Sequence, residues 1–591
     1  MKTKIFIALM AALSLTSCEN FLTIDPQDSL VIENYYTSAD NVKANTASLY
    51  GSVWGSYHRT FMWLAGDLLA GDIYYTYDAE GQFYYNQVGA GNVHNNYGWQ
   101  GLYRVISWSN AIINDMPDAA RENGVDEQVI QEAIAEARLF RGLSYYMIAE
   151  YWGEAPIVEN ATATITSSNP EDIFLNRNTQ SNLYQFACED LKFASETLPE
   201  TASQSGRVTK WSALGALSKV YITRGAYEQN TEYFTLAKEY ARQVIEDSGL
   251  ALYADYSSMF DIAANNSSES LIAIQMMCGN YGLGNSRNVN WSRSSRIADQ
   301  TWGGGKGPST SLQQQYLSAT NQAKDVEDLV ATDWNFADGR QQWVFMTHNN
   351  YYPNLNKADG GYTYQFVYRN PADLETTVES YNFNLAHIKK YVIGLAADNN
   401  GQVDLNQNAG NNLYLLRLSD VYYVYAEAVM GLNNSTSDEK AMGYINQVLE
   451  RGKAGYTVSE LTYEQLIKER RKEFAMEGIN WFDIKRYYYH DETAALAYLN
   501  GMKRDRIYSW NWDWDTEHLN APTEERYEAE QLRKNYAPTW ETKVDPDDWK
   551  SDRVETIIFN NASMYLAIPA EETTKAPTLL EPAVDYYADK E

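Results

Sequence analysis

Residues 207–227 read RVTKWSALGALSKVYITRGAY, and this stretch predicts the fold class. Its apolar side chains recur at the spacing of one helical face, as Leu214, Leu217, Val220 and Tyr221. We expect Gly225 to end this helix. A second helix should follow, with Ala237 and Val244 on one face. The stretch therefore predicts two paired helices joined at a glycine.

A second segment repeats this plan about 200 residues later. Its apolar positions are Leu418, Tyr422, Tyr425 and Val429. Gly431 is the expected break, and Ala441 and Val448 repeat the seven-residue spacing of the first unit. The repeat indicates tetratricopeptide-like helical pairs, each of which buries its apolar face only against its neighbours. Two unrelated amphipathic hairpins are the alternative interpretation.

Two further helices are predicted. One runs from about residue 129 to 151, with Asp126 as its N-cap and Gly153 after its end. The other runs from about residue 463 to 477 and ends at Gly478. Between the helices, residues of about 280–410 and 490–560 are rich in aromatic and polar side chains with weak periodicity. Long irregular insertions on a helical scaffold are where binding usually resides.

The N-terminus has the pattern of a lipoprotein signal. Two lysines and the apolar run IFIALMAALSL (5–15) precede Leu-Thr-Ser-Cys at 15–18. The run is too short to span a bilayer. Because Leu-Thr-Ser-Cys has the lipobox order of a branched apolar residue, two small residues and a cysteine, we expect cleavage after residue 17 and lipid attachment to Cys18. A secretory signal with a small-residue cleavage site is the alternative. No later apolar stretch is long enough to cross a membrane, so lipid is the expected tether.

The charge restricts the partners. The formal net charge of −31 argues against nucleic acid or an anionic polymer as ligand, and it is compatible with a neutral one. Cys188 and Cys278 remain after Cys18, and we expect them to be unpaired, buried thiols.

Seven stretches together resemble the SusD/RagB family of outer-membrane nutrient-binding lipoproteins. They are CENFLTIDP (18–26), AEARLFRGLSYYMIAEYWGEAPIV (135–158), residues 207–227 above, IKKYVIG (388–394), LYLLRLSDVYYVYAEAV (413–429), IKERRKEFAMEGINWFDIKRY (467–487) and YLAIPAEE (565–572). They occur in the family's order and extend over the chain from Cys18 onward.

The resemblance implies a mainly α fold, with tetratricopeptide-like helical pairs and an irregular, loop-rich, partly β half. It implies a single domain over residues 18–591, with helical pairs at about 30–270 and 411–490. It also implies a SusC-like TonB-dependent outer-membrane transporter as partner and a lipid-anchored position facing the cell exterior. The charged side chains of its motifs are expected to serve packing and ion pairing; they are Arg138, Arg141, Glu469, Arg470, Arg471 and Glu473.

Catalytic motifs are not evident in the sequence. The six histidines lack metal-ligand spacing, no GxSxG elbow occurs, and Gly303 to Lys306 lacks the spacing of a phosphate loop. Asp513, Asp515 and Glu517 alternate as in a calcium loop but lack its glycine and distal glutamate. We therefore expect no metal, no cofactor and no enzymatic activity. A pair of carboxylates for glycoside hydrolysis is the enzymatic alternative.

Two polar, aromatic segments are the candidate binding regions. Sugar rings present apolar faces and hydroxyl edges, so their binding calls for flat aromatic side chains with polar groups around them. The segments lie at residues 71–85 and 281–302, in regions that the family also uses. The candidate ligand-binding residues are Asp72, Tyr74, Tyr75, Tyr77, Arg287, Asn288, Trp291 and Trp302. The tryptophans at 510, 512 and 514 are secondary candidates for contact with the transporter.

The leading hypothesis is a lipoprotein that binds a polysaccharide or oligosaccharide at the cell surface and delivers it to the transporter. A peptide-capturing, RagB-like protein is the main alternative, since peptide recognition relies on backbone hydrogen bonds and side-chain pockets. A surface glycoside hydrolase is a weaker alternative. A scaffold that recruits other proteins would not need its aromatic insertions to be exposed.

Overall fold

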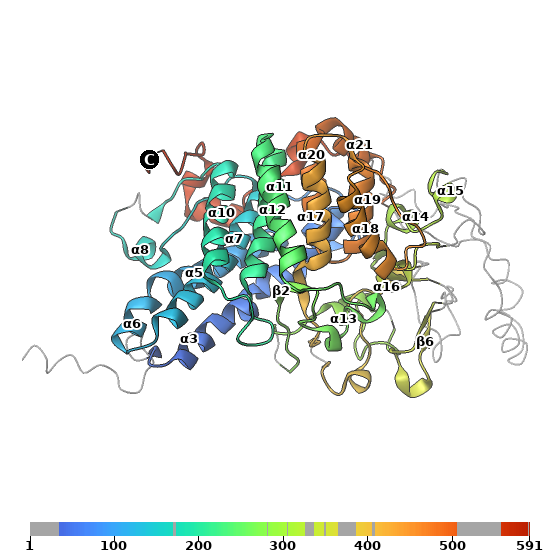
Figure 1. Ribbon diagram of the computed structural model, residues 1–591, viewed down its shortest axis with the longest axis horizontal. Helices are drawn as coiled ribbons and strands as arrows, with labels where there is room; N and C mark the ends of the chain where they lie inside the picture. Colours follow the sequence, from blue (N-terminus) through green and yellow to red (C-terminus); the bar gives the residue numbers. More distant parts are fainter. Residues whose placement is uncertain are drawn as a thin grey trace, which may run out of the picture.

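The computed structural model describes most of the chain. The described residues are 35–169, 173–279, 282–292, 294–303, 305–324, 336–347, 350–364, 386–404, 408–504, 557–588 and 590. Within them the chain is mainly α, with a helical half and a loop-rich half (Figure 1). Cys18 and residues 510–517 lie outside the described residues, so the predictions made for them stay predictions.

The longer helices build one half of the molecule. In the described residues, those of eight residues or more are α3 (Ala39–Thr46), α5 (Val93–Asn114), α7 (Glu127–Trp152), α10 (Gln180–Thr197), α11 (Lys210–Glu228), α12 (Thr231–Asp247), α17 (Leu418–Met430), α18 (Glu439–Arg451), α19 (Tyr463–Phe474), α20 (Asn480–His490) and α21 (Glu492–Asn500). Helices α7, α10, α11, α12 and α17 pack in succession, each against the next, and lie beside one another in Figure 1. None of the described helices is long and apolar enough to cross a membrane.

Both predicted helical pairs are confirmed. Helix α11 packs on α12, and α17 packs on α18, while α12 contacts α17 and so joins the two pairs. Ala237 and Val244 are buried in the first pair, and Ala441 and Val448 are buried at the equivalent positions of the second. The seven-residue spacing therefore marks the face by which each second helix packs.

The helix predicted at 129–151 is also confirmed. It is α7, which begins at Glu127, and the side chain of Asp126 accepts a hydrogen bond of 2.8 Å from the amide of Gln128. Gly153 follows its end with φ of +77°. Arg141 of α7 lies 2.7 Å from Asp190 of α10, as expected for an arginine that ties helices together.

Two predicted helix ends are wrong. Helix α11 continues past Gly225 to Glu228, and Gln229 ends it in the left-handed conformation, with φ of +53°. Gly225 instead makes room for a ring, because a Cβ there would lie 3.3 Å from Phe234 of α12. Helix α19 ends at Phe474, three residues before the predicted end, because Met476 has φ of +71°.

The second half consists of loops with short elements. Its short helices are α13 (Arg287–Trp291), α14 (Thr310–Gln314), α15 (Ala319–Gln322) and α16 (Gln341–Val344). The described strands form antiparallel pairs: β1 (Ile73–Tyr74) with β3 (Gly307–Pro308), β2 (Ser270–Ile274) with β8 (Leu413–Arg417), β4 (Phe345–Met346) with β7 (His387–Ile388), β5 (Tyr351–Tyr352) with β6 (Tyr362–Thr363), and β9 (Ser435–Thr436) with β10 (Leu461–Thr462). Both cysteines are free thiols, as predicted; Cys188 is buried, but the prediction of a buried thiol is wrong for Cys278, which is half-buried.

A buried network of charges fixes β2 and β8 against α18 and α19. Arg417 of β8 lies 2.6 Å from Glu269 and 2.7 Å from Glu477. Arg451 of α18 lies 2.6 Å from Glu269 and also 2.6 Å from Glu473 of α19. Glu269, Arg417, Glu473 and Glu477 are buried, and the side chain of Arg451 is 5% exposed. Such a network is stable because every charge in it has partners, whereas removing one partner leaves a buried charge uncompensated.

A second network joins the helical pairs to α19 and α20. Asp420 of α17 lies 2.5 Å from Lys219 of α11 and 2.7 Å from Arg470 of α19. Arg470 and Arg486 both contact Asp483 of α20, at 2.8 and 2.7 Å. The prediction that the charges of residues 467–487 serve packing and ion pairing is confirmed for Arg470, as it is for Glu473.

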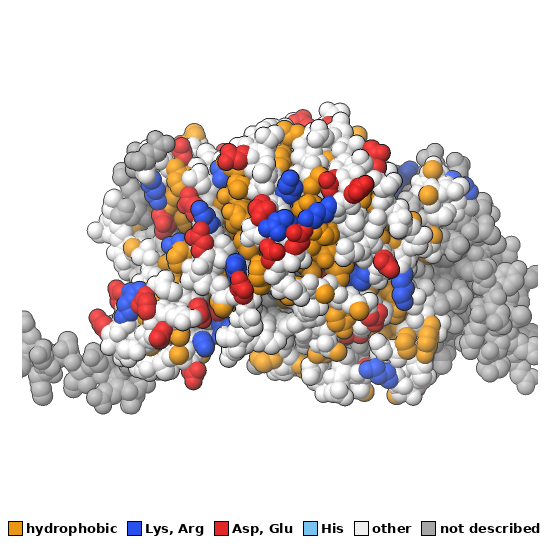
Figure 2. Space-filling model, viewed as in Figure 1, with side chains coloured by type: hydrophobic (Ala, Val, Ile, Leu, Met, Phe, Trp, Pro, Cys, Tyr) orange, Lys and Arg blue, Asp and Glu red, His pale blue; other side chains and the backbone are white. Residues whose placement is uncertain are grey.

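The surface charges are mixed on the face shown in Figure 2. Acidic and basic side chains lie close together over the helices, and Glu246 of α12 pairs with Lys440 of α18. No extended basic patch covers the described part of this face, although a nucleic-acid-binding surface would need one.

The ionisation of Glu473 predicts a pH-dependent stability. Burial raises the pKa of Glu473, but the positive charges of Arg451, Arg417 and Arg340 outweigh this effect and lower the pKa to about 2. Because the folded pKa lies below the unfolded one, ionised Glu473 stabilises the fold above about pH 4.5, and this contribution is lost as the pH falls toward 2.

We therefore expect the difference in unfolding free energy between the wild type and Glu473→Gln to shrink by about 2 kcal/mol from pH 6 to pH 3. Urea unfolding followed by tryptophan fluorescence at each pH measures this difference. An equal difference at both pH values would show that Glu473 is not held ionised.

Candidate ligand-binding site

The first candidate binding segment lies beside the part of the chain that directly follows the second. Strand β1 pairs with β3 in antiparallel register, so that Ile73 faces Pro308 and Tyr74 faces Gly307. Next to this pair, Ser309 donates its amide to the carbonyl of Asp72 at 2.8 Å and its hydroxyl to the carbonyl of Gly71 at 2.6 Å. These bonds bring residues 71–74 against residues 307–309.

Three of the eight predicted site residues reach the surface there. Trp302 is 55% exposed, Tyr77 is 44% exposed and Tyr75 is half-buried. The rings of Tyr75 and Tyr77 lie 5.5 Å apart, and a Cβ on Gly305 would come within 3.3 Å of both rings. We call Trp302, Tyr75 and Tyr77 the aromatic platform.

The other five predicted residues are buried, so the expectation that they are exposed to ligand is wrong. They are Asp72, Tyr74, Arg287, Asn288 and Trp291. Trp291 is 0% exposed, because residues 287–291 form the helical turn α13 rather than an open loop, and its ring packs near Tyr391 and the guanidinium of Arg287. Asn288 exchanges hydrogen bonds with the backbone of residues 393–394. Asn288 and Trp291 thus hold residues 287–291 against residues 391–394.

A pocket lies at the foot of the platform. It has a volume of about 410 Å³, which falls within the range of small-ligand sites. We call it the platform pocket; it is lined by Arg59, Thr60, Trp63, Tyr75, Glu80, Ser286, Asn290, Trp302 and Lys306. The lining combines three aromatic rings with both hydrogen-bond donors and acceptors, as sugar recognition requires.

Lys306 is enclosed by the aromatic wall of the pocket. Its ammonium lies 4.6 Å from the centroid of the Tyr75 ring and 5.5 Å from that of Trp63. It also donates to the carbonyls of Asn290 and Trp302, each at 3.4 Å. Burial lowers the pKa of Lys306, against the opposing effect of Glu80. These contacts fix the backbone of Trp302 relative to the tyrosines.

Tyr75 remains a neutral phenol at physiological pH. Burial raises its pKa, and the nearby carboxylate of Glu80 raises it further. A neutral phenol can donate a hydrogen bond to a ligand or a neighbour as well as accept one.

Several residues of the platform pocket were not predicted. Arg59, Thr60 and Trp63 lie in the helical turns of residues 57–68, which are mostly buried, and the sequence has no signal that separates them from core residues. Glu80 lies within the first predicted segment and Lys306 follows the second, and the β1–β3 pairing brings these two parts of the chain together.

The acidic side chains in the lining of the platform pocket bear on the alternative of glycoside hydrolysis. Among the residues that line the pocket, Glu80 is the only carboxylate, whereas glycoside hydrolysis needs two at about 5 to 10 Å. In the described part of the chain, no group of three or more His, Cys, Asp or Glu side chains could hold a metal ion.

Comparisons with known proteins agree with this architecture. The family model described as SusD family matches residues 268–586, and a model described as starch-binding and associating with the outer membrane matches residues 27–222. A SusD-like protein of Bacteroides ovatus is 30% identical over 607 residues, covering 99% of this chain and 98% of that protein.

Solved structures share the fold. A structure with xylogluco-oligosaccharide superposes with a TM-score of 0.73 at 29% identity, over 92% of this chain and 99% of that chain. A SusD-like carbohydrate-binding protein of Bacteroides fragilis superposes with a TM-score of 0.67 at 19% identity, over 92% and 99% of the two chains. The family models and the full-length relative agree with the helical pairs and the loop-rich half: this chain belongs to the SusD family.

Proposed function

We propose that this protein captures a neutral oligosaccharide or polysaccharide on the aromatic platform. The observation that carries the proposal is that Trp302 and Tyr75 line the platform pocket together, while the ring of Tyr77 lies 5.5 Å from that of Tyr75. Exposed rings on a fixed backbone offer flat surfaces for the apolar faces of sugars, while Glu80 and Asn290 offer partners for hydroxyl groups. An open surface of this kind suits a long chain that no closed cavity would admit.

Two further observations support a neutral glycan as the ligand. A family member with 29% identity over nearly the whole chain has been solved with xylogluco-oligosaccharide. The net charge of −31 disfavours the approach of an anionic polymer. The pocket itself holds two cations and one carboxylate, so it provides both donors and acceptors for hydroxyl groups.

We extend the proposal to the place and the partner of the protein. Cleavage after residue 17 and lipid attachment at Cys18 would hold residues 18–591, as one domain, on the outer membrane and facing the exterior. From there the captured glycan would pass to a SusC-like TonB-dependent transporter. This part rests on the sequence of the first 18 residues and on the family.

The first test is a comparison of two exposed tryptophans. We expect Trp302→Ala to weaken glycan binding at least about tenfold, because an aromatic anchor contributes roughly 2 kcal/mol or more. Trp108→Ala removes a tryptophan of 44% exposure on α5, outside the platform pocket, and should leave binding unchanged. Every contact described here lies within residues 35–590, so the chain from Glu19 onward can be used.

Retardation in gels that contain neutral plant, fungal or bacterial polysaccharides gives the binding, and calorimetry gives the affinity. Peptides are screened in parallel. Equal retardation of both variants would place the glycan elsewhere, and binding of peptides without any glycan would replace the proposal by peptide capture.

A second test separates binding from hydrolysis. Because Glu80 is the only carboxylate that lines the pocket, we expect the wild type to release no reducing ends from the glycan that it binds. Glu80→Gln keeps the size of the side chain and should weaken affinity several-fold through its hydroxyl contacts. Release of reducing ends by the wild type, abolished in Glu80→Gln, would instead identify a hydrolase.

A further inference from the structure

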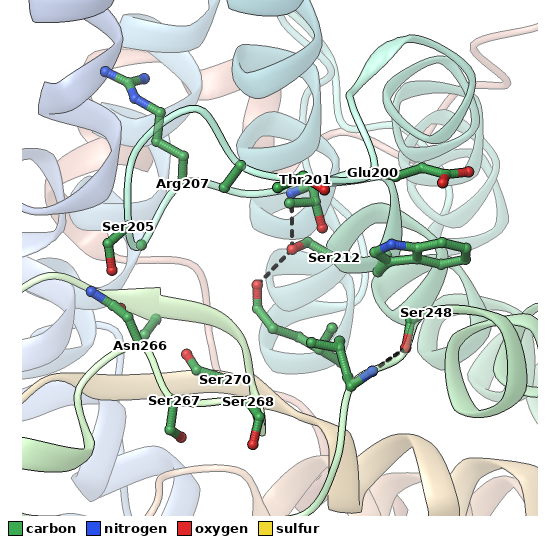
Figure 3. Close-up of a pocket in the computed structure, with 17 residues that line it drawn as sticks. Glu200, Thr201, Ser205, Arg207, Ser212, Ser248, Asn266, Ser267, Ser268 and Ser270 are labelled. Atoms are coloured by element: carbon green, nitrogen blue, oxygen red, sulfur yellow. Dashed lines mark hydrogen bonds between the residues drawn. The ribbon is translucent and has the colours of Figure 1, made fainter.

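A second pocket lies where three connections of the first helical pair meet (Figure 3). Its walls come from residues 200–212, which lead into α11, residues 248–250 after α12, and residues 266–273 at the start of β2. We call it the serine pocket. It shares no lining residue with the platform pocket, and its volume of about 360 Å³ suits a small ligand.

The charges beside the serine pocket are neutralised within the protein. Glu200 lies 2.9 Å from Lys210, and Arg207 lies 2.8 Å from Glu136. The guanidinium of Arg207 and the carboxylate of Glu200 point away from the centre of the pocket (Figure 3). The pocket therefore offers a ligand no net charge, which disfavours an anion or a cation.

Hydroxyl groups line the pocket from all three connections. Ser212 donates to the carbonyl of Leu271 at 2.6 Å, so that its oxygen is fixed in the wall. Thr201, Ser205 and Ser270 make no side-chain hydrogen bond to another residue in the part of the chain that the structure describes. Their hydroxyls can both donate to and accept from a ligand.

The apolar part of the wall includes the indole of Trp211, which is 7% exposed, together with Ala202, Leu250, Leu271 and Ala273. Trp211 is the second residue of α11, and it lines the pocket. The ammonium of Lys210 lies over the Trp211 ring, 5.0 Å from the ring centroid. An aromatic wall beside unpaired hydroxyls matches a ring that has apolar C–H groups on its face and hydroxyls on its edge.

The opposite wall is fixed before any ligand binds. Asn266 and Gln275 exchange two hydrogen bonds of 3.0 and 2.9 Å. The chain passes close to them at Gly206, which has φ of +88° and where a Cβ would lie only 2.8 Å from Asn266. A rigid wall reduces the entropy that binding would cost.

We propose that the serine pocket is a second carbohydrate site, which binds one neutral pyranose unit. The unit is either a free monosaccharide or the end of a glycan chain. The serine pocket shares no lining residue with the platform pocket, so binding at one site does not require binding at the other.

The test uses a background without the platform, the double variant Trp302→Ala/Tyr77→Ala of the chain from Glu19 onward. Saturation-transfer NMR is recorded with glucose, galactose, mannose and xylose in turn, and with an oligosaccharide of each. Ser205→Trp is then added to fill the pocket. Ser203→Trp, in the same connection and also exposed but not lining the pocket, is the matched control.

We expect a sugar signal in the platform-free background that falls at least fivefold with Ser205→Trp and persists with Ser203→Trp. A monosaccharide signal identifies a site for free sugar, and a signal from an oligosaccharide alone identifies a site for a chain end. No signal from any sugar, or a signal that survives Ser205→Trp, overturns the proposal.

The outcome is independent of the platform. Ser205→Trp in the otherwise wild-type chain should still be retarded by the polysaccharide, because the two pockets share no residue. Loss of retardation in the Trp302→Ala variant would support the platform as the polysaccharide site and would not bear on the serine pocket.

Discussion

A fully buried ion pair between Asp72 and Arg471 connects the helical half of the protein to its proposed binding surface. Arg471 belongs to α19, and its Nε lies 2.6 Å from the carboxylate of Asp72. Its Nη2 donates to the carbonyl of Gly71 at 2.8 Å, and Asn480 donates to Asp72 at 3.0 Å. The position of residues 71–78, and with them Tyr75 and Tyr77, depends on this contact. Removing one partner of such a pair costs about 3 to 5 kcal/mol, because the other charge stays buried.

The same region carries a second constraint, which is a close approach of two backbone segments. A Cβ on Gly66 would lie 2.0 Å from the carbonyl oxygen of Gly478, so only glycine fits between the turns of residues 57–68 and the chain after α19. Asp67 accepts a hydrogen bond of 3.0 Å from the amide of Gly478. Arg59 and Trp63, which line the platform pocket, lie on these turns. The scaffold thus holds two separate segments of the site, residues 57–68 and 71–78, in fixed positions, which lowers the entropy that ligand binding would cost.

How far the sequence predicts this structure depends on whether a residue's role is local. The periodicity of residues 207–227 and 413–429 predicts both helical pairs, because each helix shows its packing face in its own sequence. Gly225 shows the limit of such prediction. The rule that a glycine ends a helix considers only the local sequence, whereas the role of Gly225 depends on its contact with Phe234 of the next helix. The short irregular segments show the same limit, because a single helical turn such as α13 has no measurable period.

The candidate site was predicted at the level of segments but only partly at the level of residues. Trp291 and Trp302 both lie in polar, aromatic sequence, yet one is buried and the other is exposed. The difference arises from tertiary contacts, since Arg287 and Tyr391 enclose Trp291 while Lys306 fixes the backbone beneath Trp302. Glu80 and Lys306 come from parts of the chain that the β1–β3 pairing joins, and Arg59 and Thr60 come from the helical turns of residues 57–68. No local sequence pattern predicts that these segments meet.

The most direct measurement of the central claim is a crystal structure of the chain from Glu19 onward, grown with an oligosaccharide of the glycan that retards it most. The account predicts density for a sugar ring lying parallel to the indole of Trp302, in van der Waals contact at about 4 Å, with hydroxyls directed into the platform pocket. Ordered sugar elsewhere on the molecule, with Trp302, Tyr75 and Tyr77 bare, would contradict it.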